Sequence, residues 1–167
     1  MTAEEITKYL NELNDELRLM NIKGEVSLFG GAVMVLAFNA RAATKDVDAI
    51  FRPAEEIRKA AAVIAARHGM RDSWLNDGVK GYWASHDEKI LFSLPFLTVF
   101  IPEPDYMLAM KAIAARAGTD DINDARLLIK LIGLHSPEEV FSIVENYYPR
   151  HQIPPRTAYF IEGLFEK

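Results

Sequence analysis

Cysteine is absent from this 167-residue sequence, which excludes thiol nucleophiles, thiolate metal sites and disulfide bonds. A phosphate-binding loop of the Walker type is also missing. No apolar run approaches the roughly 20 residues that span a bilayer, and the acidic, amphipathic start does not resemble a signal peptide. We therefore expect a cytosolic protein with no membrane partner.

Basic residues are too few to balance the acidic ones, since 19 Lys and Arg face 24 Asp and Glu and leave a formal charge of −5. This balance argues against broad non-specific binding of nucleic acid. It leaves open an RNA substrate held in one local basic groove. Half of the residues are apolar and about a quarter are charged, which is typical of a globular protein that buries its own core.

Hydrophobic spacing predicts alternating strands and helices in the front part of the chain and helices in the rest. Thr2 and Glu5 fit a capping box before the first helix, and Gly69 fits the end of the third. We expect an α+β protein with residues 1–104 as an α/β core and residues 105–167 as a helical bundle or cap. The predicted helices are 3–20, 32–39, 54–69, 105–117, 121–133, 137–147 and 156–166, and the predicted strands are 25–29, 46–51, 79–84 and 90–100.

The first chemical signal is the pair Gly30-Gly31 between a predicted strand and a predicted helix. Glycine lacks a Cβ, so another group can approach such a turn closely. The unpaired N–H groups of a following helix would face that group, and this arrangement suits a phosphate. Taken alone, a Gly-Gly turn is also an ordinary loop.

The second signal is Asp46-Val47-Asp48 on the next predicted strand. Residues two apart on a strand share a face, so these carboxylates should project together, with Cα atoms roughly 7 Å apart. Mg²⁺ (or Mn²⁺) prefers hard oxygen ligands and commonly combines one or two protein carboxylates with phosphate oxygens. The pair therefore predicts a metal and nucleoside triphosphate site. Charged residues on an exposed strand face are the plain alternative.

Together the diglycine turn and the Asp-x-Asp strand resemble the nucleotidyltransferase fold of polymerase-beta-like enzymes. The chain looks closer to a bacterial subgroup that includes AbiEii-type toxins and small proteins of the DUF6036 type. This resemblance implies a mixed β-sheet flanked by helices, an enzyme that transfers a nucleoside monophosphate from a triphosphate, and a possible antitoxin partner. RNA, a protein or a small molecule could supply the acceptor hydroxyl.

The resemblance also assigns roles to individual residues. Gly30, Gly31, Arg41, Thr44, Lys111 and Arg116 would bind the nucleotide. Asp46, Asp48 and Asp121 would be catalytic, with Asp46 and Asp48 holding the metal and Asp121 acting near the acceptor hydroxyl or ordering the site. Asp121 could equally be a helix-capping residue.

Two departures from the family pattern keep a second interpretation open. The predicted central strand Phe96–Ile101 carries no third carboxylate, and Asp120 stands where the toxin subgroup usually has a basic residue. The alternative is therefore a catalytically weak or inactive module of the same fold that binds a nucleotide or a protein partner.

Overall fold

The computed structural model describes residues 1–115 and 121–166, which divide into two compact units. Unit 1 comprises Met1–Gly81 and Glu88–Ile101, and unit 2 comprises Tyr82–Asp87 and Pro102–Lys167. Each unit therefore contains two separate stretches of the chain. Within the described ranges, no helix is both long enough and apolar enough to cross a membrane.

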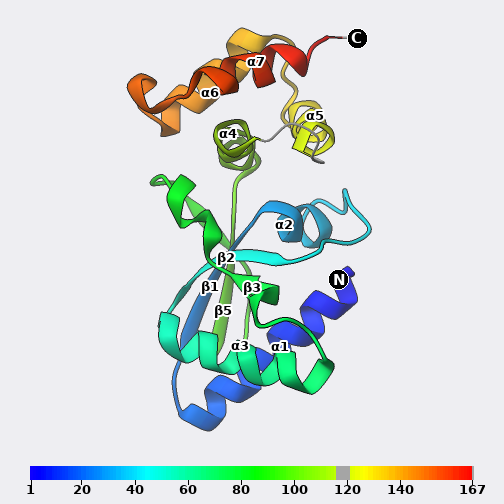
Figure 1. Cartoon of the computed structure of the whole chain (residues 1–167), viewed down its shortest axis with the longest axis vertical. Coiled ribbons are helices and arrows are strands. Elements are labelled where there is room, and N and C mark those ends of the chain that lie inside the picture. The colour runs from blue at the N-terminus through cyan, green and yellow to red at the C-terminus, as the bar shows by residue number, and fades with distance from the viewer. Residues whose placement is uncertain (116–120, 167) are drawn as a thin grey trace. The chain divides into compact units, whose positions relative to one another are not determined.

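Unit 1 is built on a mixed five-stranded sheet in the order β3-β2-β1-β5-β4 (Figure 1). Strand β1 pairs antiparallel with β2 and parallel with β5, and β2 pairs parallel with β3. The expected α+β class with a mixed sheet flanked by helices is thus confirmed. The strands are β1 (Gly24–Phe29), β2 (Val47–Arg52), β3 (Leu75–Asn76), β4 (Glu88–Ser93) and β5 (Leu97–Pro102).

Three helices accompany this sheet, and α1 and α3 lie side by side (Figure 1). The predicted capping box is present, because the Thr2 hydroxyl accepts from the Glu5 N–H and the Glu5 carboxylate accepts from the Thr2 N–H. Gly69 ends α3 with a left-handed φ of 65°. The helices are α1 (Ala3–Met20), α2 (Gly30–Leu36) and α3 (Ala54–His68).

Helix α1 is tied to its neighbours by polar contacts as well as by its buried apolar face. The Asn14 amide oxygen accepts from the Phe96 N–H at 2.8 Å, which anchors the turn between β4 and β5. On the other side, Arg67 and His68 at the end of α3 bind the Glu12 carboxylate. These contacts fix the helix pair that packs beside the sheet.

Two predicted strands differ in the structure. Residues 90–100 were expected as one strand, but they belong to β4 and β5, which are separated by a turn that the Leu94 N–H closes on the Leu97 carbonyl.

The segment between β3 and β4 is the second difference. Residues 79–84 were expected to form a strand, but Gly78–Tyr82 is the 3-10 helix η2. Asp77 precedes it, and its carboxylate lies 2.7 Å from the Lys80 Nζ and also pairs with Arg58. These ion pairs and a hydrogen bond from the Lys80 N–H to the Asp77 carbonyl favour a turn. A second 3-10 helix, η1 (Asp72–Trp74), precedes β3.

Unit 2 contains four α-helices that pack together, as expected for the C-terminal part of the chain. Segment 82–87 joins them through aromatic contacts: the His86 ring stacks on Tyr106 with centroids 3.7 Å apart, and the Tyr106 hydroxyl accepts from the Ala84 N–H. The helices are α4 (Pro104–Ala114), α5 (Asp121–Ile132), α6 (Pro137–Tyr147) and α7 (Pro155–Gly163), with the 3-10 helix η3 (Arg150–Gln152) before α7.

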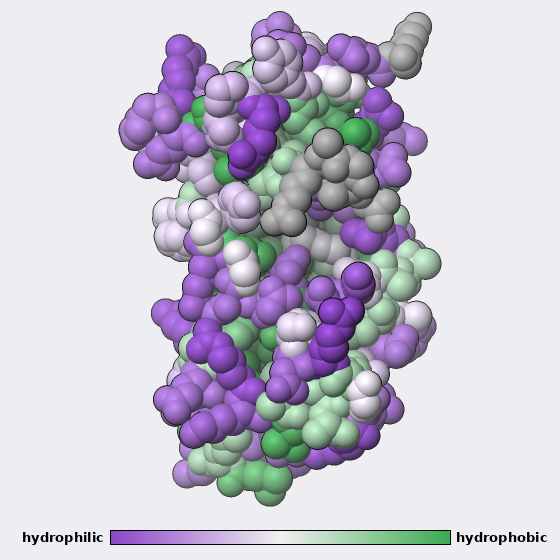
Figure 2. All heavy atoms as spheres, viewed as in Figure 1, coloured by the Kyte–Doolittle hydropathy of each residue, from purple (hydrophilic) through white to green (hydrophobic). Residues whose placement is uncertain are grey.

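Hydrophilic residues cover much of the face drawn in Figure 2, with hydrophobic residues between them. The core is apolar in both units: Leu10 and Val26 are completely buried in unit 1, as are Leu108 and Val140 in unit 2. Some large apolar side chains nevertheless reach the surface, and Tyr159 on α7 is 77% exposed.

Candidate functional site

The diglycine turn lies at the junction of β1 and α2 in unit 1. Gly30 is the first residue of α2 and has a φ of +58°, a conformation that side chains rarely adopt. A Cβ built on Gly30 would lie 2.9 Å from the Asp48 Oδ2. Glycine is therefore required here both by the backbone conformation and by the close approach of the carboxylate.

The register of the sheet explains why Asp48 reaches this turn. Asp48 on β2 pairs with Phe29, the last residue of β1, so its side chain emerges beside the residue that follows. The alternation along β2 agrees with the predicted faces, since Val47, Ala49 and Phe51 are buried and Asp48 is half-buried. The carboxylate thus lies on the face that meets the turn.

Gly31 is enclosed by the loop that leads into β2. A Cβ at Gly31 would overlap the Thr44 hydroxyl and lie 3.0 Å from the Arg41 Nη1. The Thr44 hydroxyl also donates to the Asp46 carbonyl at 3.1 Å, which fixes its orientation within the loop. A hydroxyl, a guanidinium and a carboxylate therefore all adjoin the two glycines.

Asp46 occupies a different position from the one predicted. The strand begins at Val47, so Asp46 belongs to the loop one residue before it and is half-buried. This loop is attached to the start of the chain, because the Thr44 N–H donates to the Met1 carbonyl at 2.9 Å and Thr2 bridges Ala43. The loop is held by backbone contacts, and the β2 ladder begins only after it.

Asp46 and Asp48 offer the carboxylate oxygens that a hard divalent cation prefers. Among the described residues, no group of three or more His, Asp or Glu side chains forms a metal cage. Two carboxylates from Asp46 and Asp48 are the number that Mg²⁺ commonly takes when phosphate oxygens and water complete its shell.

Lys111, Asp121 and Asp124 form a separate charged cluster inside unit 2. The Lys111 Nζ lies 3.0 Å from the Asp124 Oδ2 and 3.4 Å from the Asp121 Oδ1. The Lys111 and Asp124 side chains are only 10% and 5% exposed. Such a pair is strongly coupled, because removing one partner leaves a charge away from water.

The structure therefore brings the predicted residues together as two sets. Gly30, Gly31, Arg41, Thr44 and Asp48 adjoin one another in unit 1, with Asp46 in the adjoining loop. Lys111 and Asp121 adjoin each other in unit 2, and Arg116 lies outside the described residues. Asp124, to which no role was assigned from the sequence, lies one helical turn after Asp121, so both carboxylates are on one face of α5.

Comparison with protein-family models, with curated proteins and with solved structures found no match for this chain. The structure defines the class of the protein, which is an α+β fold with a mixed five-stranded sheet and a helical second unit.

Proposed function

We propose that the chain is a cytosolic Mg²⁺- or Mn²⁺-dependent nucleotidyltransferase that moves a nucleoside monophosphate from a triphosphate to an acceptor hydroxyl. The observation that supports this most directly is the Asp48 carboxylate at the Gly30 turn. The absence of a side chain at Gly30 lets this carboxylate lie against the start of α2, where a divalent ion would offset its charge. The acceptor could be RNA, a protein or a small molecule.

In this proposal Asp46 and Asp48 hold the divalent ion. Bound there, the ion would supply positive charge for the phosphates and the leaving group. The chain itself would bind and orient the triphosphate. The guanidinium of Arg41 offers charge-assisted hydrogen bonds to a phosphate. The Thr44 hydroxyl has one O–H donor, so it could bind a phosphate only by releasing its hydrogen bond to the Asp46 carbonyl.

Lys111 and Asp121 enter this proposal through the resemblance described above. Lys111 is a phosphate ligand in it, and Asp121 acts near the acceptor hydroxyl or orders that part of the site. The contact between their side chains agrees with an ordering role, since a carboxylate at 3.4 Å restricts where the ammonium group can lie.

The decisive experiment replaces Asp48 by Asn and measures pyrophosphate release from each of the four nucleoside triphosphates with Mg²⁺. We expect release to fall by at least a hundredfold, because an amide is a poorer ligand and carries no charge. The control is Asp72→Asn, which removes an exposed carboxylate elsewhere in unit 1. Equal activity of the parent and a folded Asp48→Asn variant would refute the proposal.

The second candidate is a nucleotide- or partner-binding module without turnover. It is favoured by one observation, the compensation of the Lys111 charge by both Asp124 and Asp121. Calorimetry with each triphosphate, with and without Mg²⁺, separates the two candidates. Tight binding without pyrophosphate release supports the module, and measurable release supports the enzyme.

A role as a toxin with an antitoxin partner follows only from the family resemblance. Expression of the protein should then arrest growth, and Asp46→Asn should relieve the arrest. Growth unaffected by expression would count against this role.

A further inference from the structure

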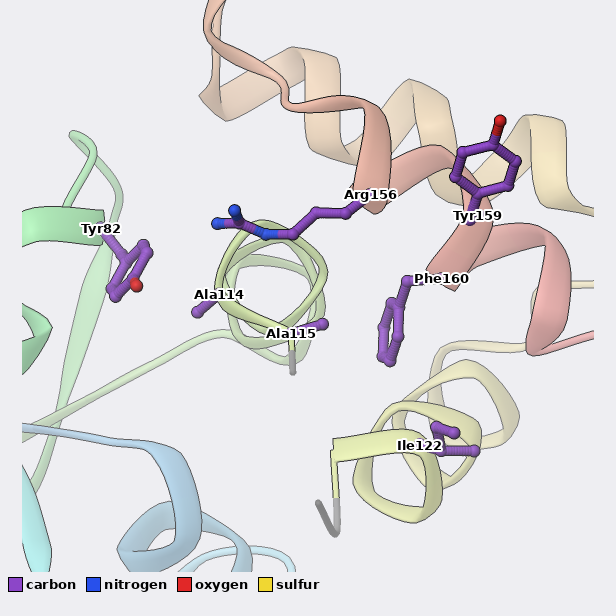
Figure 3. Close-up of a pocket in the computed structure, with 7 residues that line it drawn as sticks. All are labelled: Tyr82, Ala114, Ala115, Ile122, Arg156, Tyr159 and Phe160. Atoms are coloured by element: carbon purple, nitrogen blue, oxygen red, sulfur yellow. The ribbon is translucent and has the colours of Figure 1, made fainter. Parts of the chain in front are cut away.

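Unit 2 contains a pocket of about 600 Å³ whose described lining comes from this unit alone. Its volume falls within the usual range for small-molecule sites, roughly 300–1,000 Å³. Figure 3 shows the end of α4 at its centre, with α5 and α7 on one side and Tyr82 on the other. The lining residues are Tyr82, Ala114, Ala115, Ile122, Arg156, Tyr159 and Phe160.

The elements around the pocket are fixed by buried hydrogen bonds. The Thr157 hydroxyl, which is completely buried, donates to the Ala112 carbonyl at 2.9 Å and holds α7 against α4. The Tyr148 hydroxyl donates to the carbonyl of Tyr82. These two hydrogen bonds hold α7 against α4 and fix the backbone of Tyr82 beside the pocket.

Arg156 supplies the one charged group in the described lining. Its Nη2 donates to the Ile113 carbonyl at 3.3 Å, and Figure 3 shows the guanidinium extending across α4 toward Tyr82. A guanidinium has five N–H donors, so one such bond leaves others for a ligand. The positive charge of this guanidinium beside the pocket would attract an anionic ligand.

The rest of the described lining is apolar and largely aromatic. Figure 3 shows the Phe160 ring between α7 and α5, on the side of Ile122. Ile122 and Tyr159 are 40% and 77% exposed, which is a large amount of apolar surface left in water beside one pocket. Flat aromatic groups cover such surfaces well, because stacking adds to the area that is buried.

We propose that this pocket binds one nucleotide, with its base on the aromatic lining and its phosphate on Arg156. The ligand is either a free nucleoside monophosphate or a nucleotide unit of an RNA strand. A base contributes a flat ring that stacks on Tyr or Phe, and the phosphate contributes the anion. This site uses none of the residues of the Gly30 and Asp48 cluster and needs no Mg²⁺, so it does not depend on the proposed enzyme activity.

The experiment titrates the full chain, in EDTA, with each nucleoside monophosphate, the matching nucleoside and a short single-stranded RNA. Arg156→Gln should weaken binding of the monophosphate about tenfold and leave the nucleoside almost unchanged. Tyr159→Ala should weaken both about tenfold, and because Tyr159 is 77% exposed the substitution leaves the packed core intact. The matched control is Arg150→Gln, whose exposed side chain pairs with Glu145 away from the pocket.

The outcomes separate the sources of the ligand and the two sites. If Arg156→Gln weakens binding of the free monophosphate alone, the ligand is the free nucleotide. If it also weakens binding of the RNA, the ligand is a nucleotide unit of an RNA strand. Binding that is abolished by Asp48→Asn but unchanged in the Arg156 and Tyr159 variants would overturn the inference. Failure of every nucleotide and RNA to bind would overturn it as well, whatever the result for pyrophosphate release.

Discussion

Gly30→Ala should disturb the candidate site more than the fold. Gly69→Ala, in the same unit, is the matched substitution that separates the effect of the Asp48 contact from that of the backbone conformation. Gly30 and Gly69 both have left-handed backbones, with φ of +58° and +65°. A Cβ at Gly69 would meet nothing within 4 Å, whereas one at Gly30 would lie 2.9 Å from the Asp48 Oδ2. The two alanine variants therefore share the backbone strain, and only one of them meets the carboxylate.

The magnitudes follow from these contacts. A left-handed backbone costs a non-glycine residue about 1–2 kcal/mol, which is the expected loss of unfolding free energy for Gly69→Ala. At Gly30 the Asp48 carboxylate must also rotate out of its position, and an off-rotamer side chain costs about 0.5–1.5 kcal/mol. We expect a total of about 2–3 kcal/mol for Gly30→Ala, together with loss of Mg²⁺-dependent pyrophosphate release because the carboxylate is displaced.

Urea unfolding measures the difference if the signal comes from unit 1. Trp74 is buried there, so the series is made in a Trp83→Phe background that removes the tryptophan of unit 2. The Asp48→Ala variant completes a double-mutant cycle, in which the cost of Gly30→Ala should fall to that of Gly69→Ala. Equal costs for the two glycine variants with Asp48 intact would show that Asp48 does not lie against the turn, and the site would have to be abandoned.

Two further predictions concern ion pairs in the two units. Burial raises the pKa of the Glu12 carboxyl, but hydrogen bonds from Arg67 and His68 outweigh it and hold this pKa below the usual value of 4.5. Glu12→Gln should therefore cost about 1 kcal/mol of unfolding free energy above pH 4.5. The difference from the parent should vanish as the pH falls through the lowered pKa, because the parent's carboxylate is then protonated. Denaturation curves recorded across that pH range measure the difference. In unit 2, Lys111→Met should cost about 3–5 kcal/mol in urea unfolding, because it removes the ammonium group that lies 3.0 Å from the buried Asp124 carboxylate. Adding Asp124→Asn should restore at least half of that loss.

Lys59→Met is the control for Lys111→Met. The Lys59 and Glu55 side chains are both exposed, so their ion pair should contribute less than about 1 kcal/mol to the unfolding free energy. A Lys111 variant as stable as this control would show that the buried pair contributes nothing. For Glu12, a stability difference that persisted unchanged at low pH would exclude the carboxylate as its source.

The parts of the fold that depend on local rules were predicted closely. The capping box of Thr2 and Glu5, the left-handed Gly69 and the two-residue alternation along β2 are each set by a few neighbouring residues. The strand expected over 79–84 was wrong because contacts of Asp77 favour a 3-10 turn there. One contact is local, with Lys80 three residues on, and the other is with the distant Arg58 on α3, which the sequence did not predict.

The site shows the same limit. The closeness of Gly30 and Asp48 follows from the antiparallel pairing of β1 and β2, whose direction and register were not predicted from the sequence. Asp124 was missed because its contact with Lys111 joins two helices. Arg156 and Phe160 could not be predicted as site residues because neither belongs to a motif. Only the packing of α7 on α4 places both at one pocket.

The chain crosses between its two units at residues 81–82, 87–88 and 101–102, and this limits how the protein can be divided. Truncating the chain after Ile101 would separate the hexapeptide Tyr82–Asp87 from Tyr106 and Tyr148, which it contacts through stacking and hydrogen bonds. Neither unit is therefore available as a simple terminal truncation. The helical part is therefore more than a C-terminal appendage, since one of its segments lies in the sequence between the two segments of unit 1.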